Sequence, residues 1–395
     1  MTLNMRGLPF EVPRYSLTGD VLSFQRCPLQ YRYYNGSSLP PSRPVQMWTG
    51  EFVHGVLEEA FRHWQLHHPP FPWPCHPTPW PSPPTPLARA SNDIGVLGDL
   101  VETKLAAGGK RPRSRTARDA AYGRVEAGVN ILAPHLFPLI TSAEQQISGT
   151  RAMPPLPGGG QPRGDRYELT GIVDVISSVV VAANVNNPLV QVIQQLLTPA
   201  LTDYDLIVDY KAMRRPRAQG GGAWQHQEWQ VQTYAWLCQQ VPQSRPVGAG
   251  ILVYVNELSP SRTDLEALKR ELNQNATDVV PVSGSPDYYA LHNWQPALGV
   301  AVPQLSPAFR LRRAIRVIDV ASAHLQNAVT EIDQVIGRIE DSALNEHNAG
   351  NIPNHWAACG DAQDCDACDF RHFCPSPADQ RISNPQPRTP PVAPG

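Results

Sequence analysis

The spacing of apolar residues divides the chain into a helical first part and a mixed second part. Residues 47–65 place Val53, Leu57, Ala60 and Trp64 at helical spacing, which predicts a helix with one buried face. The pattern also predicts a shorter helix within 16–35 and further helices over about 88–107 and 117–142. After residue 142 the character changes to strands.

The second part alternates strands with helices. Residues 166–181, 203–213 and 247–258 are rich in β-branched residues and predict three strands. A helical period over 225–240 predicts a helix between the last two, and 306–345 predicts one long helix or two. This order indicates a single mixed α/β core with helical additions.

Proline and charge add less specific information. Of the 395 residues 42 are proline, concentrated in an insertion at 67–86 and in a tail at 381–395 that we expect to be disordered. The net charge of −2 gives no sign of a nucleic-acid partner. Basic clusters occur at 109–118, 211–217 and 309–316, for which a solvated surface is the simpler interpretation.

Cysteine usage points to a metal site. Four of the seven cysteines lie between Cys359 and Cys374, and this clustering near one end is more typical of metal binding than of a secreted disulfide framework. The sequence has no apolar run long enough for a signal peptide or a membrane span, so a cytoplasmic location is the expectation.

One predicted strand carries paired charges. Because side chains alternate along a strand, Asp209 and Lys211 share one face while Val208 and Tyr210 share the other. If the strand containing Asp174 is adjacent, two carboxylates and an amine converge. Such a group suits a hard divalent ion such as Mg²⁺ or Mn²⁺. Taken alone, the D-x-K tripeptide is more typical of a surface salt bridge.

The neighbouring motifs change that interpretation. The sequence contains GEFVHGVLE (50–58), GIVD (171–174), DYK (209–211) and QVQTY (230–234) in this order. Together they resemble the motifs of the RecB-like branch of the PD-(D/E)XK nuclease superfamily. Iron-sulfur members of that branch, including AddB-type recombination nucleases and four-cysteine CRISPR-associated nucleases, have one cysteine upstream of the core and a C-x-x-C-x5-C group downstream. Here these positions are Cys27 and then Cys365, Cys368 and Cys374.

The resemblance runs from about residue 16 to 377 and implies a fold. We expect a restriction-endonuclease-like core, a central mixed sheet flanked by helices, at about 45–257 within a single nuclease domain at 1–380. A helical segment at 258–345 and an iron-sulfur clasp, formed by Cys27 with 355–377, would complete the domain. The clasp would hold a 4Fe-4S cluster that staples the C-terminal end to the N-terminal helix. An all-cysteine zinc site, for which Cys359 offers a spare ligand, is the alternative.

The resemblance also implies residue roles. Asp174, Asp209, His54 and the carbonyl of Tyr210 would bind the divalent metal, and Lys211 would assist the attacking water. Gln230 and Tyr234 would contact the substrate or brace the site, although Tyr234 also suits a core position. Arg214 and Arg215 are candidates for phosphate contacts. Glu58 has either a role in the site or an ordinary solvent-facing position.

The function implied is metal-dependent hydrolysis of DNA, as an exonuclease on single-stranded ends in recombination, repair or CRISPR-type processing. The chain has no P-loop, so any unwinding would come from a separate helicase. The alternative is a DNA-binding or scaffold subunit of a helicase–nuclease complex in which cleavage depends on the partner.

Overall fold

The computed structural model describes most of the chain. The described residues are 12–36, 46–79, 88–197, 200–218, 224–241, 245–297, 299–352, 354–361, 364–365, 368–371 and 374. The expected disordered tail at 381–395 and residues 80–86 of the proline-rich insertion lie outside them.

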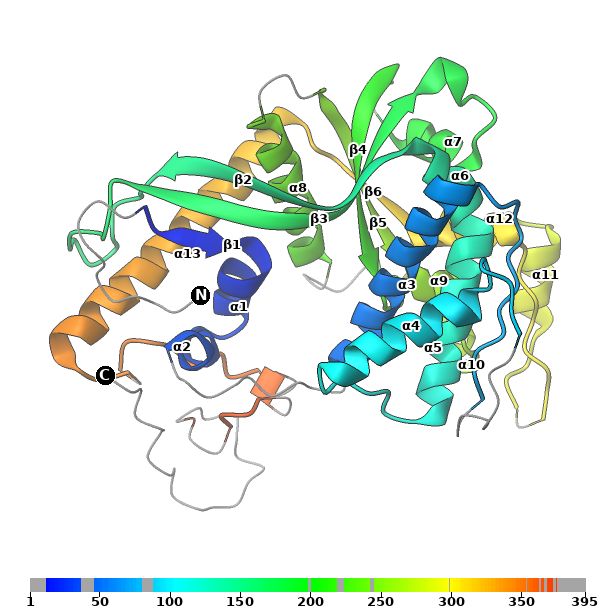
Figure 1. Cartoon of the computed structure of the whole chain (residues 1–395), viewed down its shortest axis with the longest axis horizontal. Coiled ribbons are helices and arrows are strands. Elements are labelled where there is room, and N and C mark those ends of the chain that lie inside the picture. The colour runs from blue at the N-terminus through cyan, green and yellow to red at the C-terminus, as the bar shows by residue number, and fades with distance from the viewer. Residues whose placement is uncertain are drawn as a thin grey trace.

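A curled mixed sheet forms the centre of the fold (Figure 1). Its strands are β1 (Arg14–Ser16), β2 (Ile140–Ala152), β3 (Arg166–Val180), β4 (Asp203–Lys211), β5 (Val247–Tyr254) and β6 (Ile315–Ile318). The order is β1-β3-β4-β5-β6, and β2 pairs with β3 in a long hairpin. β4 and β5 run parallel, whereas β3–β4 and β5–β6 are antiparallel. The expected α/β core with a mixed sheet is confirmed.

Helices flank the sheet on both faces (Figure 1). The longer ones are α2 (Pro28–Gly36), α3 (Gln46–His67), α4 (Ile94–Ala107), α5 (Arg115–Ala127), α7 (Pro188–Leu196), α8 (Gln225–Gln239), α10 (Arg262–Asn273), α11 (Pro286–Asn293), α12 (Pro307–Ala314) and α13 (Ser322–Ala349). The shorter turns are η1 (Leu17–Leu22), α1 (Ser23–Arg26), η2 (Gly128–Leu132), α6 (Ala133–Leu136), η3 (Phe137–Leu139), η4 (Val181–Ala183) and α9 (Val255–Leu258).

The alternation of β4 separates two hydrophobic cores. Leu206 and Val208 pack with α3, α4 and α5 in one core, whereas Ile207 packs with α8 and α13 in the other. Burial on both faces explains why this strand is apolar at consecutive positions. Asp209 and Lys211 continue the Ile207 face, so the predicted split of side chains along this strand is confirmed.

The segment 258–345 departs from the sequence-based expectation. Residues 315–318, predicted as helix, form strand β6, which pairs with Gly250–Val253 of β5. The β-branched Ile315, Val317 and Ile318 suit this position. The preceding strand is also shorter than expected, because the chain turns into α9 at Val255. This segment therefore completes the sheet and its helical cover.

Two other regions differ in detail. The helix expected within 16–35 is instead β1, a π-helical turn, α1 and α2, with Cys27 between α1 and α2. The helix expected to reach residue 142 breaks into short turns that end at Leu139, and β2 starts at Ile140. The described part of the proline-rich insertion packs on the core, because Trp73 is buried and its backbone N–H donates to Asn130 at 2.7 Å.

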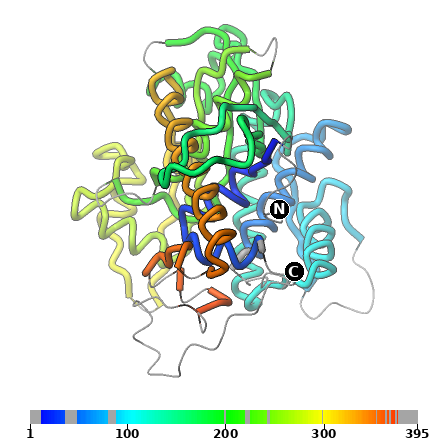
Figure 2. The backbone as a smooth tube through the Cα atoms, turned by 90° about the vertical axis from the view of Figure 1, so that its left-hand side faces the viewer, coloured from blue at the N-terminus to red at the C-terminus, as the bar shows by residue number. Residues whose placement is uncertain are grey.

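The two ends of the described chain meet. Figure 2 shows the last described residues of the chain next to the N-terminal helices. The backbone N–H of Leu29 on α2 donates to the carbonyl of Ala357 at 3.1 Å, and Trp356 is buried against Phe24 and Tyr31.

Candidate active site

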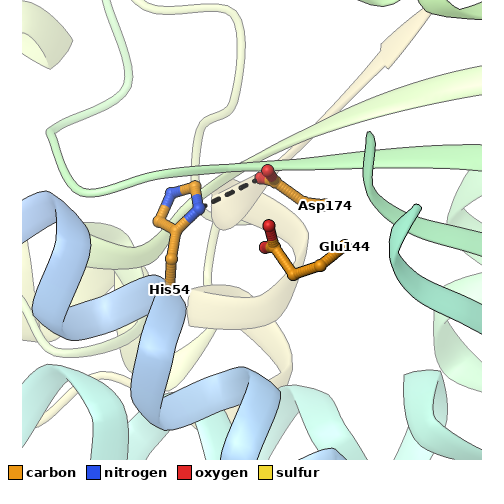
Figure 3. A group of neighbouring side chains, drawn as sticks. All are labelled: His54, Glu144 and Asp174. Carbon is orange, nitrogen blue, oxygen red and sulfur yellow. Dashed lines mark ion pairs between the residues drawn. The ribbon is translucent and has the colours of Figure 1, made fainter. Parts of the chain in front are cut away.

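A histidine and an aspartate meet at the carboxyl end of β4 (Figure 3). His54 projects from α3, and its Nε2 lies 2.9 Å from the carbonyl oxygen of Tyr210. Its Nδ1 lies 3.4 Å from Oδ2 of Asp174 on β3. The same Asp174 oxygen accepts the backbone N–H of Tyr210 at 2.8 Å. Three segments that are distant in sequence thus share one site.

A second group lies on the adjoining face of β4. The Lys211 Nζ is 2.6 Å from Oδ2 of Asp209 and donates to Oε1 of Gln230 on α8 at 2.9 Å. The Gln230 amide nitrogen in turn donates to the hydroxyl of Tyr234 at 3.0 Å. The strand motif and the following helix motif are therefore joined by a chain of side-chain contacts that ends at the lysine amine.

One candidate residue was missed from the sequence. Glu144 on β2 contributes a carboxylate whose oxygen, with ligand atoms of His54 and Asp174, falls within a group spanning at most 4.8 Å (Figure 3). Register brings it there, because Ala143 pairs with Val175 and Gln145 with Val173, which sets Glu144 opposite Asp174. The backbone of Glu144 is left-handed, at φ 48°. The available signal was a carboxylate in the polar run SAEQQ, but its pairing partner required the tertiary structure.

Burial and charge shift the pKa values of these groups. Burial raises the pKa of Asp209 to about 6, although Lys211 opposes the shift. Burial raises the pKa of Glu144 to about 7, helped by the negative charge of Asp174. Burial acts to lower the pKa of His54, but Asp174 outweighs it and the pKa rises to about 9. A nearby cation would stabilise the charged form of these buried carboxylates, which makes the site a candidate metal centre.

Two further predicted residues have other neighbours. Glu58, one turn after His54, forms an ion pair with Arg62 of the same helix. Arg214 donates to Glu271 at 2.9 Å and is half-buried.

Arg215 does not fit the expected phosphate contact. Its side chain is 5% exposed and is paired with Asp278, with Nε donating at 2.7 Å. It also donates to the backbone carbonyls of Arg313 and Ile315 at 3.1 and 2.8 Å. A guanidinium whose donors are occupied inside the protein braces the chain after β4. The sequence showed the charge of Arg215 but not that its side chain points into the protein.

The predicted cysteine ligands line one pocket near the joined chain ends. Cys27, Cys365, Cys368 and Cys374 border it, together with Cys359. Their sulfurs do not form a ligand group as tight as that of His54 within the described residues. Burial raises the pKa of the Cys27 thiol to about 11, although backbone hydrogen bonds from Gln30 and Cys359 oppose the shift. Cys238 is buried in the core as expected.

Comparison with known families agrees with the fold. Residues 202–375 match the PD-(D/E)XK nuclease superfamily. The match covers β4 with Asp209 and Lys211, α8, β5, β6, α13 and the cysteine region, whereas His54, Glu144 and Asp174 precede it. A search of curated proteins finds no relative that matches the chain.

No helix in the described ranges has the length and apolar character needed to cross a membrane.

The superfamily implies a metal-dependent nuclease, and its core architecture is the mixed sheet with flanking helices described above. The chain therefore carries, at residues 202–375, a domain of the PD-(D/E)XK nuclease superfamily.

Proposed function

We propose that this protein is a divalent-metal-dependent deoxyribonuclease whose active site is formed by His54, Asp174, Asp209 and Lys211. The observation that carries the proposal is their convergence at the end of β4. His54 contacts Asp174 and the Tyr210 carbonyl, and Lys211 contacts Asp209. A structural ion pair would need only two of these groups.

The donor set fits Mg²⁺ or Mn²⁺. Asp174, Asp209, the Tyr210 carbonyl and His54 would hold the ion, and Glu144 is a further carboxylate within reach. Oxygen donors with one imidazole suit Mn²⁺ well, and carboxylates with a carbonyl suit Mg²⁺. When bound, the ion would polarise the phosphoryl oxygen and lower the pKa of a coordinated water.

Lys211 supplies a positive charge that would oppose the negative charge developing on the phosphate. Its amine forms an ion pair with Asp209 and donates a hydrogen bond to Gln230, so its position is fixed. A positioned ammonium can orient the attacking water by hydrogen bonding and stabilise the extra negative charge that develops on the phosphate. Tyr234 would act through Gln230 as a positioning residue.

The assignment of substrate, mode of cleavage and pathway rests on the resemblance to RecB-like nucleases. We infer an exonuclease that acts on single-stranded DNA ends in recombination, repair or CRISPR-type DNA processing, in the cytoplasm and with a separate helicase as a possible partner. We extend the nuclease domain to residues 1–380. Arg214 stays a candidate for substrate contact, since it is only partly covered by Glu271.

We further infer that Cys27, Cys365, Cys368 and Cys374 hold a 4Fe-4S cluster. Their shared pocket supports this assignment, because thiols from both ends of the chain border it. When bound, the cluster would act as a structural staple between α2 and the C-terminal segment. Zinc bound by four of the five thiols is the alternative.

The test is Mn²⁺-dependent cleavage of linear and circular single-stranded DNA by anaerobically purified protein. Lys211→Ala should lose cleavage, whereas Lys269→Ala, whose amine donates to the backbone carbonyls of His292 and Trp294, should not. Attack on linear DNA alone would establish an exonuclease, and attack on both would make the enzyme an endonuclease. A folded wild-type protein that binds DNA without cutting it would contradict the proposal and favour a scaffold subunit.

A further inference from the structure

One face of α3 looks toward the active site. Glu51, His54, Glu58 and Arg62 follow one another at intervals of three or four residues, so they form a single stripe on the helix. His54 is the member that reaches Asp174 and Tyr210. Side chains that contact this stripe near His54 therefore lie beside the proposed cleavage site.

A loop rich in basic residues contacts the stripe at Glu51 through an ion pair. The loop at 108–114 connects α4 to α5, and its Lys110 forms an ion pair with Glu51. Glu51 lies three residues before His54, which is about 4.5 Å along the helix axis. Residues 109–115, GKRPRSR, contain four basic side chains and no acidic one. We call these residues the basic loop.

The basic loop keeps charge available for a ligand. Arg111 and Arg113 are exposed, and neither forms an ion pair with the described residues. Arg111 and Lys110 also border a pocket in which Arg89 and Arg118 are paired with Asp99 and Glu102.

The other two basic clusters of the sequence are used inside the fold. In the cluster at 211–217, Arg215 is buried against Asp278, and Arg214 pairs with Glu271. In the cluster at 309–316, Arg313 is 2% exposed and pairs with Glu257 and Glu271. In the cluster at 109–118 most arginines face solvent, and the one that does not, Arg118, lies outside the basic loop and pairs with Glu102.

We propose that the basic loop binds the phosphate backbone of the substrate strand next to the scissile bond. This inference rests on the proposed nuclease function, because the acidic site itself repels a polyanion and requires cations at its margin. Arg111 and Arg113 would contact phosphates without reading bases, and Lys110, fixed by Glu51, would set the distance of the loop from His54.

The test separates binding from cleavage. The affinity of the full-length protein for a labelled single-stranded oligonucleotide is measured in EDTA over a series of salt concentrations. The double variant Arg111→Gln/Arg113→Gln is compared with Arg166→Gln/Arg312→Gln, which removes two exposed arginines from β3 and α12. Both variants change the net charge equally, and thermal unfolding checks that each is folded.

We expect the loop variant to raise Kd about tenfold and to lower the salt slope by about 1.4, because each lost contact to single-stranded DNA removes about 0.7. The control should bind like the wild type. Equal losses in both variants, or none in the loop variant, would overturn the inference. Mn²⁺-dependent cleavage by the wild type, measured separately, decides the proposed function whatever the loop does.

Discussion

The ring of Tyr234 on α8 lies against the backbone of Gly171 on β3. A Cβ atom at Gly171 would come within 2.7 Å of the Tyr234 ring, closer than side chains normally approach. The glycine of the strand motif and the tyrosine of the helix motif are therefore one packing unit. The Tyr234 hydroxyl accepts from Gln230, which in turn accepts from Lys211, so this contact helps to fix the lysine amine.

Gly171→Ala should therefore damage the active site through packing. We expect a loss of about 1–3 kcal/mol in the free energy of unfolding, which is usual for an overpacked core, together with reduced kcat. Chemical denaturation and single-turnover cleavage measure the two effects. Gly149→Ala, which would also contact Trp236 and Leu237 on α8 but at 3.1 Å or more, is the matched control. A fully active Gly171→Ala protein would show that Tyr234 does not position Lys211.

Removing the charged groups of the site should abolish cleavage without unfolding the protein. Lys211→Ala and Asp174→Ala should each lower the rate at least 10²-fold, roughly the scale of one positioned acid–base or electrostatic group. Circular dichroism and iron content should stay at wild-type values. Simultaneous loss of activity, helicity and iron would instead indicate that the fold had collapsed.

The pKa of His54 predicts how stability depends on pH in the metal-free protein. The folded-state pKa of about 9 exceeds the unfolded value near 6.5, so protonation favours the folded state. This stabilisation, at most about 3 kcal/mol, is complete below pH 6.5 and is lost as pH rises to about 9. Thermal unfolding in EDTA from pH 6.5 to 9.5 tests it.

His54→Gln should remove this part of the pH dependence. Added Mn²⁺ should stabilise the wild type more as pH rises, because the ion competes with the His54 proton. An unchanged pH profile in the variant would refute the assignment of the shift to His54.

Arg215 should matter for stability rather than for DNA affinity. Arg215→Ala removes one of the two arginines that pair with Asp278, the other being Arg316, and the side-chain donor to two backbone carbonyls. We expect a loss of about 2–4 kcal/mol in unfolding free energy, below the full cost for a buried pair because Asp278 is partly exposed. Arg217→Ala, whose side chain is 52% exposed, should change stability little. Weaker DNA binding at unchanged stability in Arg215→Ala would contradict this role.

The cysteines should be tested by metal content. Cys368→Ser should lose the brown colour and the bound iron of anaerobically purified protein and should unfold at a lower temperature, because the staple between the chain ends is lost. Cys238→Ser, in the core helix α8, should keep its iron. Zinc without iron in the wild type would show that the thiols bind zinc instead of a cluster. No metal at all would refute the clasp.

Local patterns in the sequence predicted much of the fold. The helices α3 and α8 and the strands β3 and β4 could be located because burial of one face imposes a period of 3.6 or 2 residues. β6 was missed because four residues between two helices carry too little periodicity, and only pairing with β5 makes them a strand.

The sequence by itself determined the candidate residues, because the motifs that contain His54, Asp174, Asp209, Lys211 and the cysteines are local. Only the tertiary structure decided which charges face the site. It placed Glu144 opposite Asp174 through strand register and turned Arg215 inward to Asp278. Both outcomes depend on partners distant along the chain, and the free energy of burying a charge depends on those partners rather than on the charge itself.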